Sequence, residues 1–215
     1  MPNWVYCNVN VSGPAEDMAA FRAAARKGVR FYPENSDSDW GDFTDIQLEA
    51  LMQEAARLQE VESKDEFDFH SLYPVPLAVQ VMPYDDGTLN RLIKSNPAVA
   101  AFCKKYDVVS GYDWERMNWG VKWGDCQTEI TDESPESFSL YFETAWSPPH
   151  EFWKKVSADY PTLTISMDYS EEMSHFAGES EYHGGEAYIN EWQPDLNDND
   201  DDDDDDDDDD VEGEE

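Results

Sequence analysis

SFSLYFETAWSPPHEFWKKVSADYPTLTISMDY, residues 137–169, predicts a strand, a helix and a second strand in direct succession. Apolar and polar residues alternate over 137–146 and again over 163–169, which is the period of a strand with one buried face. Ser147-Pro148 is typical of a helix start and Pro161 of a helix end, so a helix is expected over 150–160. This order decides how the rest of the chain is interpreted.

The N-terminal region repeats the pattern. Trp4–Val11 alternates as a strand, Pro14 opens a helix over Ala15–Lys27, and Gln127–Thr131 is a strand that would form a hairpin with 137–146. The resulting β-α-β-β-α-β order indicates an α+β, ferredoxin-like antiparallel sheet covered by two helices. An added C-terminal hairpin is predicted from two further strand patterns, at Met173–Glu179 and Glu186–Trp192, joined through His183-Gly184-Gly185.

A helical insertion is expected at about residues 28–125. Its features are an irregular acidic loop over 31–43, a helix opened by the capping-box pair Thr44 and Gln47, a short strand at Phe67–Leu72, a short helix near 88–94 and a helix opened by Asn96-Pro97. We therefore expect one domain over 1–194 and a disordered acidic tail over 195–215.

Charge limits the class of partner. The chain has 50 acidic and 14 basic residues, and 16 of the acidic ones lie after residue 194, so the remaining body still has a net charge of −20. Such a surface repels phosphate backbones and attracts cationic partners. Direct nucleic-acid binding is therefore not expected.

The N-terminus has no basic segment followed by an apolar run, and no stretch approaches the roughly 20 apolar residues that span a bilayer. The three cysteines, Cys7, Cys103 and Cys126, form no C-x-x-C pair. Free thiols fit a reducing cytoplasm, and no membrane association is expected.

Five short motifs occur in order: PNWVYCNVNVSGP at residues 2–14, NWGVKW at 118–123, WSPP at 146–149, YP at 160–161 and FAG at 176–178. Together they resemble the YubB ferredoxin-like family over about residues 1–190, with Val121 where threonine is typical and Gly124 as a less usual neighbour of the last tryptophan. That family comprises phage- and plasmid-borne proteins without an assigned activity. The resemblance implies a mobile-element protein in a bacterial host cell and transfers no catalytic residue.

The stretch MNWGVKWGDC, residues 117–126, is open to two interpretations. In the first, Trp119 and Trp123 close one end of the sheet and anchor the insertion, with their indole N–H groups paired. In the second, Trp119, Lys122 and Trp123 line a small pocket that binds a ring or a phosphate.

Motifs for catalysis are lacking in the sequence: there is no H-E-x-x-H, nucleophile elbow, P-loop or Rossmann glycine pattern. His183 with Glu186 could ligate a metal, although a hairpin turn accounts for the same residues. We expect no enzyme activity, no cofactor and no metal site.

Eleven consecutive aspartates follow the last predicted strand. An extended chain places its carboxylates about 3.3–3.6 Å apart, close to the roughly 3.4 Å phosphate spacing of one DNA strand. This run is the candidate partner-binding segment, with a solubilising tail as the alternative, and it consists of Asp200, Asp201, Asp202, Asp203, Asp204, Asp205, Asp206, Asp207, Asp208, Asp209 and Asp210.

Two hypotheses for the function follow. The first is an acidic interaction protein encoded by a phage or plasmid, of the counter-defence inhibitor type, that covers a basic, nucleic-acid-binding surface of a host protein. The second is a module that binds a small ligand or nucleotide at its Trp-rich end.

Overall fold

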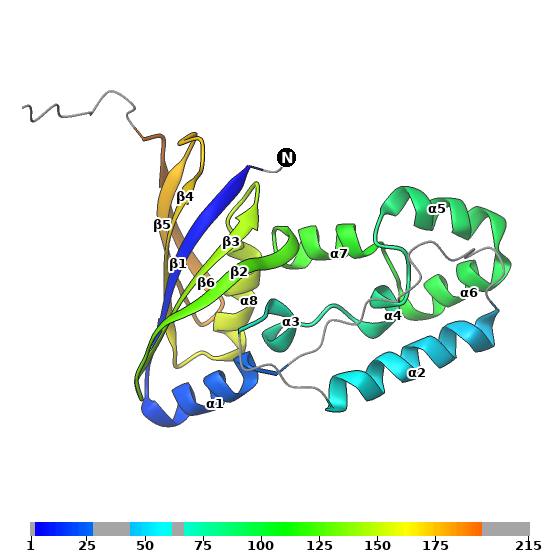
Figure 1. The fold of residues 1–215 in the computed structure, drawn as a ribbon, viewed down its shortest axis with the longest axis horizontal. Coiled ribbons are helices and arrows are strands. Elements are labelled where there is room, and N and C mark those ends of the chain that lie inside the picture. The colour runs from blue at the N-terminus through cyan, green and yellow to red at the C-terminus, as the bar shows by residue number, and fades with distance from the viewer. Residues whose placement is uncertain (1–2, 28–43, 62–66, 195–215) are drawn as a thin grey trace, which may run out of the picture.

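A six-stranded antiparallel sheet organises the computed structural model, which describes residues 3–27, 44–61 and 67–194 (Figure 1). The strand order across the sheet is β2-β3-β1-β4-β5-β6. The strands are β1 (Trp4–Ser12), β2 (Lys122–Glu133), β3 (Ser137–Ala145), β4 (Thr164–Glu171), β5 (Ala177–His183) and β6 (Glu186–Trp192).

Strand β1 lies at the centre and shows why one side of the sheet is the core. Val5, Cys7, Val9 and Val11 are buried, while the residues between them are exposed or half-buried. The strand pairs along its whole length with β3 and from Val5 to Ser12 with β4. Because side chains alternate between the two faces, this register buries one apolar row from each of three adjacent strands.

Helices α1 (Ala15–Ala25) and α8 (His150–Asp159) complete the expected unit. The order β1-α1-β2-β3-α8-β4, with β4-β1-β3-β2 as neighbours, is the split βαβ arrangement. The ferredoxin-like α+β prediction is confirmed, and β5 and β6 extend the sheet beyond β4 as the added hairpin.

The segment between α1 and β2 carries the helices of the insertion, which extend away from the sheet in Figure 1. They are α2 (Asp45–Val61), α3 (Phe69–Leu72), α4 (Leu77–Gln80), α5 (Asp86–Ser95), α6 (Pro97–Tyr106) and α7 (Gly111–Asn118). An aromatic cluster joins them to the sheet: the Phe69 ring stacks on Phe152 of α8 at 3.8 Å and meets Phe142 of β3 edge-on. Within the part of the chain that the structure describes, no helix is long and apolar enough to cross a membrane.

Two predicted helix starts are confirmed by their hydrogen bonds. The Thr44 amide donates to Gln47 Oε1 at 2.8 Å and the Gln47 amide to Thr44 Oγ1 at 3.4 Å, which is a capping box. The Asn96 side chain accepts from the first amides of α6, with Pro97 at the first helical position.

Several predicted boundaries are wrong. Residues 67–72 contain the short helix α3 instead of a strand, because the Asp68 carboxylate accepts the His70 amide as a helix cap. Strand β5 begins at Ala177 instead of Met173, and β2 begins at Lys122, earlier than expected. Helix α8 has Pro149 at its N-cap position, while the Ser147 hydroxyl donates to the Gly120 carbonyl instead of capping the helix.

The predicted hairpin turn is confirmed at Gly184-Gly185, which joins β5 to β6. Both glycines have positive φ, 57° and 87°. Two successive residues in this conformation define the tight turn whose twist matches antiparallel strands. The predicted stop at Gly28, the loop over 31–43 and the acidic tail lie outside the described residues.

Candidate functional site

The side of the sheet opposite the helices is the candidate site, and we call it the open face. In Figure 1 the described helices lie on one side of the sheet, and no other described element covers the opposite side. Its residues follow from the strand register, since residues directly opposite each other in adjacent strands point to the same side. One row across the sheet is Glu129, Tyr141, Asn8, Asp168, Glu179 and Asn190, and the next is Asp132, Ser139, Asn10, Ser166, Glu181 and Tyr188.

Carboxylates dominate the charge of the open face. Exposed acidic side chains come from four strands: Glu129, Asp132, Asp168, Glu179, Glu181 and Glu186. Among the described residues that the register places on this face, Lys122 is the one lysine or arginine. Arg22 of α1 and Arg26, which follows that helix, lie elsewhere, because both pair with Glu133 on the helix-covered side, at 3.4 and 2.5 Å. The open face therefore favours cationic partners.

Glu143 on the same face is buried and held by two donors. The Tyr141 hydroxyl donates to its Oε1 and the Gln127 amide to its Oε2, each at 3.0 Å. Burial, together with this hydrogen bond, raises the pKa of Tyr141 to about 12. Tyr141 therefore stays protonated and neutral at physiological pH, and the pair stabilises the sheet without supplying a nucleophile.

One edge of the open face carries a compact group that we call the tryptophan cluster: Lys122, Trp123 and Trp146. The Lys122 ammonium lies 3.4 Å from the ring centroid of Trp123 and 3.5 Å from that of Trp146. The two indoles are 5.9 Å apart, inclined by 37°, and 40% and 47% exposed. Lys122 stands opposite Ala145, the last residue of β3. The cluster is thus an ammonium held between two half-exposed aromatic rings.

Backbone geometry at this cluster is unusual. Trp123 has φ 69° and Trp146 has φ 68°, a left-handed conformation that costs about 1–2 kcal/mol for a residue with a side chain. The Trp123 amide donates to Glu115 Oε2 at 2.7 Å, and the Trp146 amide to the Asn3 carbonyl at 2.8 Å, so tertiary contacts hold both residues in place. Partial loss of hydration lowers the pKa of Lys122.

Trp119 does not share this site. Its side chain is fully buried, its Nε1 donates to the Tyr73 carbonyl at 2.9 Å, and it packs edge-on against Phe69 and Trp114. Of the three predicted pocket residues, the structure therefore brings Lys122 and Trp123 together and assigns Trp119 to the junction between the insertion and the sheet. Trp119 matches the anchoring interpretation of the motif, whereas half-exposed Trp123 does not.

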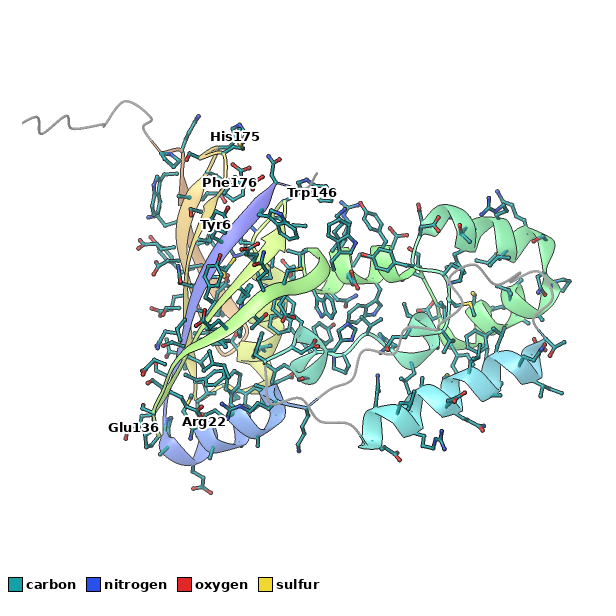
Figure 2. All side chains as sticks on the ribbon, in the orientation of Figure 1. Tyr6, Arg22, Glu136, Trp146, His175 and Phe176 are labelled. Atoms are coloured by element: carbon teal, nitrogen blue, oxygen red, sulfur yellow. The ribbon has the colours of Figure 1, made fainter. Side chains whose placement is uncertain are left out.

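The same end of the sheet carries the turn between β4 and β5, and Figure 2 shows Trp146, His175 and Phe176 at this end, opposite Arg22 and Glu136. Glu171 shapes the turn by accepting the amides of Met173 and His175 at 2.9 and 3.1 Å. Burial alone would raise the pKa of Glu171, but these donors outweigh it and hold its pKa below the ordinary value. Met173 in this turn is left 60% exposed.

Other titratable side chains lie elsewhere among the residues that the structure describes. No group of three or more His, Cys, Asp or Glu side chains there could hold a metal ion. His150 Nδ1 lies 2.5 Å from the Tyr182 hydroxyl, which lies 2.9 Å from Ser180 Oγ, but this chain is packed between α8 and the sheet. His183 has its Nδ1 at 3.1 Å from the Leu163 carbonyl, and the aspartates of 200–210 lie outside the described residues.

Sequence reasoning missed two parts of this site. Trp146 was visible within WSPP, but its contact with Lys122 depends on the pairing of β2 with β3, which local periodicity does not reveal. The open face was visible as the polar half of each alternating strand, for example Asn8 and Asn10 in β1. Only the register shows that the polar halves of six strands form one surface.

Comparison with known proteins supports the fold. Residues 119–212 match a family model described as the ferredoxin-like domain in Api92-like protein. The crystal structure of the protein api92 from Yersinia pseudotuberculosis superposes with a TM-score of 0.55 at 12% identity, covering 90% of this chain and 99% of that one. A search of curated proteins finds no match. Neither description names a reaction, a ligand or a partner, so both likenesses concern the fold.

Proposed function

We propose that this protein is an acidic interaction protein whose open face binds a cationic surface of another protein. The observation that supports this most directly is the set of exposed carboxylates on strands β2, β4, β5 and β6 of this face, where Lys122 is the one lysine or arginine among the described, register-paired residues. Opposite charges across an interface accelerate encounter and suppress incorrect partners.

Aromatic residues give the same face the composition of an interface. Tyr188 is 70% exposed and Trp192 is 47% exposed on β6, and the tryptophan cluster borders the opposite edge. Tryptophan and tyrosine are the residues that most often carry binding energy at protein interfaces, and a guanidinium or ammonium group stacks favourably on either.

In its specific form, the proposal is that a phage or plasmid encodes this chain and that it acts in the bacterial cytoplasm. It would cover a basic, nucleic-acid-binding surface of a host protein, as a counter-defence inhibitor does. The support is the net charge of −20 on residues 1–194, the aspartate run and the motif resemblance to YubB proteins. Under this proposal the protein is not an enzyme, because binding alone blocks the partner.

A capture experiment with three baits tests the proposal. The wild type is compared with Glu179→Lys/Glu181→Lys on the open face and with Glu54→Lys/Glu60→Lys on α2, which changes the net charge equally at exposed sites elsewhere. Each bait is incubated with bacterial lysate at about 50 mM and about 500 mM salt, since screening weakens exposed charge pairs. A chain ending at residue 194 is run in parallel to test the aspartates.

The expected result is one basic protein retained by the wild type and the α2 variant at low salt, and lost with the open-face variant and at high salt. Double-stranded DNA should then compete with the bait for that protein. Retention by the open-face variant at wild-type levels would contradict the proposal. Loss of capture only in the shortened chain would move the binding function to the aspartate run.

The tryptophan cluster favours a second function, the binding of a small, flat anion. An aromatic ring could stack on the outer face of either exposed indole while its negative group pairs with the Lys122 ammonium. Titration of tryptophan fluorescence with nucleotides and aromatic carboxylates tests this. Quenching that disappears in Trp146→Ala and Lys122→Met would support it, and an unchanged spectrum at millimolar ligand would exclude it.

A further inference from the structure

The two edges of the sheet differ in how well they are protected against pairing with another chain. At the β2 edge, the pairing with β3 shifts register at three places, and Trp123 and Gln127 adopt left-handed backbone conformations. Such bulges twist an edge strand and interrupt its row of free hydrogen-bonding groups. At the β6 edge, the pairing with β5 is regular from His183–Glu186 to Ala177–Trp192.

Strand β6 lacks the lysine and proline that often guard an edge, and its charged side chains are the glutamates Glu186 and Glu191. EAYINEW contains no lysine or proline, and every residue in it is exposed. Tyr188, Ile189 and Trp192 are among the most exposed large apolar side chains of the described chain, at 70%, 44% and 47%. Natural sheets protect long edges with charge, proline or bulges, and β6 has only negative charge, which repels acidic strands but not cationic ones. A regular edge of this kind indicates a binding site for a cationic strand.

We propose that β6 binds an extended, lysine- or arginine-bearing segment of the partner as a seventh strand. The charge of that segment rests on the proposed function, whereas the mode of binding rests on the edge itself. Backbone hydrogen bonds to β6 would supply affinity without regard to sequence, and alternate side chains would lie over the open face.

Charge complementarity selects this occupant. Glu181 is the cross-strand neighbour of Tyr188, and Glu179 that of Asn190, one strand in from the edge. Two strand spacings, about 10 Å, therefore separate these carboxylates from the backbone of an added strand. A lysine or arginine side chain can cross β6 with its methylenes on the Tyr188 ring and its charge beside Glu181.

A second copy of this chain fits less well as the occupant. Pairing two β6 edges would bring together two molecules of net charge −36, each with Glu186 and Glu191 in the strand itself. Like charges across a pairing strand are destabilising. Self-association is therefore an outcome that the experiment must be able to detect.

The experiment uses the full-length protein and two capped seven-residue peptides that alternate arginine with valine. The second peptide is identical except that alternate backbone nitrogens are methylated, which preserves charge and removes the hydrogen bonds of one strand edge. Amide hydrogen exchange of the protein, read by mass spectrometry, locates the binding, and isothermal titration gives both affinities.

The expected result is at least tenfold slower exchange within residues 186–192 in the presence of the first peptide, and at least tenfold weaker binding of the methylated one. Equal affinities, or binding without protection of β6, would overturn strand addition. Protection of β6 that grows with protein concentration in the absence of peptide would identify a second copy as the occupant, and would overturn the proposal.

Two proline variants add a structural control. Successive amides of a strand point to opposite sides, so one of Tyr188→Pro and Ile189→Pro removes a hydrogen bond to β5 and the other removes one from the free edge. The variant that keeps the native circular dichroism spectrum should no longer bind the first peptide. Binding of that peptide by this variant with wild-type affinity would contradict the proposal. If both variants unfold, the comparison of the two peptides still decides.

The outcomes separate this inference from the proposed function. Loss of peptide binding in Glu179→Lys/Glu181→Lys without any β6 protection in the wild type would support the acidic open face and refute strand addition. Protection of β6 that persists in that variant with unchanged affinity would support strand addition and refute the need for the carboxylates.

Discussion

At the scale of the residue, the backbone conformation of Trp123 decides what can replace it. Trp123 lies in the left-handed region at φ 69°, where only glycine is free of steric cost, and its side chain is 40% exposed. The contacts of its indole with Lys122 and Trp146 must offset this cost in the native protein. Trp123 and Trp146 are both exposed tryptophans with a left-handed backbone, which departs from the usual backbone preferences. Functional sites often show such departures.

We predict that Trp123→Gly is more stable than Trp123→Ala by about 0.5–1 kcal/mol, the reverse of the usual order in a strand. Both variants lose the indole, but only glycine adopts positive φ without strain. Urea unfolding of the two variants, monitored by far-UV circular dichroism, measures the difference. A more stable alanine variant would show that the left-handed conformation is not retained.

At the scale of the element, local chemistry explains which predictions succeeded. Strand β1 and strand β4 were predictable because each has one face in the core, which imposes strict alternation on the sequence. The strand prediction for residues 67–72 was wrong because Phe67 and Phe69 alternate like strand residues but are buried by tertiary packing against Phe152. The Asp68 cap was the local signal of a helix there.

Local chemistry also decides which residues the Gly184-Gly185 turn accepts. Each glycine has positive φ, but a side chain at Gly184 would meet open space, whereas a Cβ at Gly185 would lie 3.1 Å from Ala158 of α8. We predict that Gly184→Asn changes stability by less than about 0.5 kcal/mol, because asparagine tolerates this turn position. Gly185→Asn should cost about 1–2 kcal/mol more, since the neighbouring helix must move. Thermal unfolding of both variants provides the comparison, and equal losses would argue against the contact with α8.

The start of α8 provides a prediction on pH. Burial lowers the pKa of His150, whose Nδ1 contacts the Tyr182 hydroxyl. Because the folded state holds the neutral imidazole, its stabilising contribution is complete above the unfolded pKa of about 6.5 and is lost as the pH falls below that value. The stability difference between the wild type and His150→Gln should therefore shrink from pH 7.5 to pH 5.5 in urea titrations. Ser180→Ala, which alters the same buried chain without removing a titrating group, should show a constant difference.

At the scale of the whole molecule, self-repulsion is the dominant long-range force. Residues 1–194 carry a net charge of −20, and the residues after them contribute the rest of the total of −36. Charge far from zero destabilises a compact state, and salt screens this repulsion within a Debye length of about 10 Å at 0.1 M. Composition alone was sufficient to predict this property, whereas the gathering of carboxylates on the open face required the strand register.

We predict that the midpoint of thermal unfolding rises by several degrees between about 10 mM and about 150 mM sodium chloride. The chain ending at residue 194 should show a smaller rise, because fewer like charges are screened. Differential scanning calorimetry at matched pH measures both. A midpoint that falls as salt is added would mean that attractive ion pairs, such as Arg26–Glu133, outweigh the repulsion.

The central position of β1 has a consequence for synthesis in the cell. Strand β1 leaves the ribosome before both of its neighbours, β3 and β4, and β4 begins only at Thr164. At 5–20 residues per second, roughly 8–30 s pass between the appearance of β1 and that of its second neighbour. During that interval Val5, Val9 and Val11 have no completed sheet to join, so β1 is a segment on which a ribosome-associated chaperone would act.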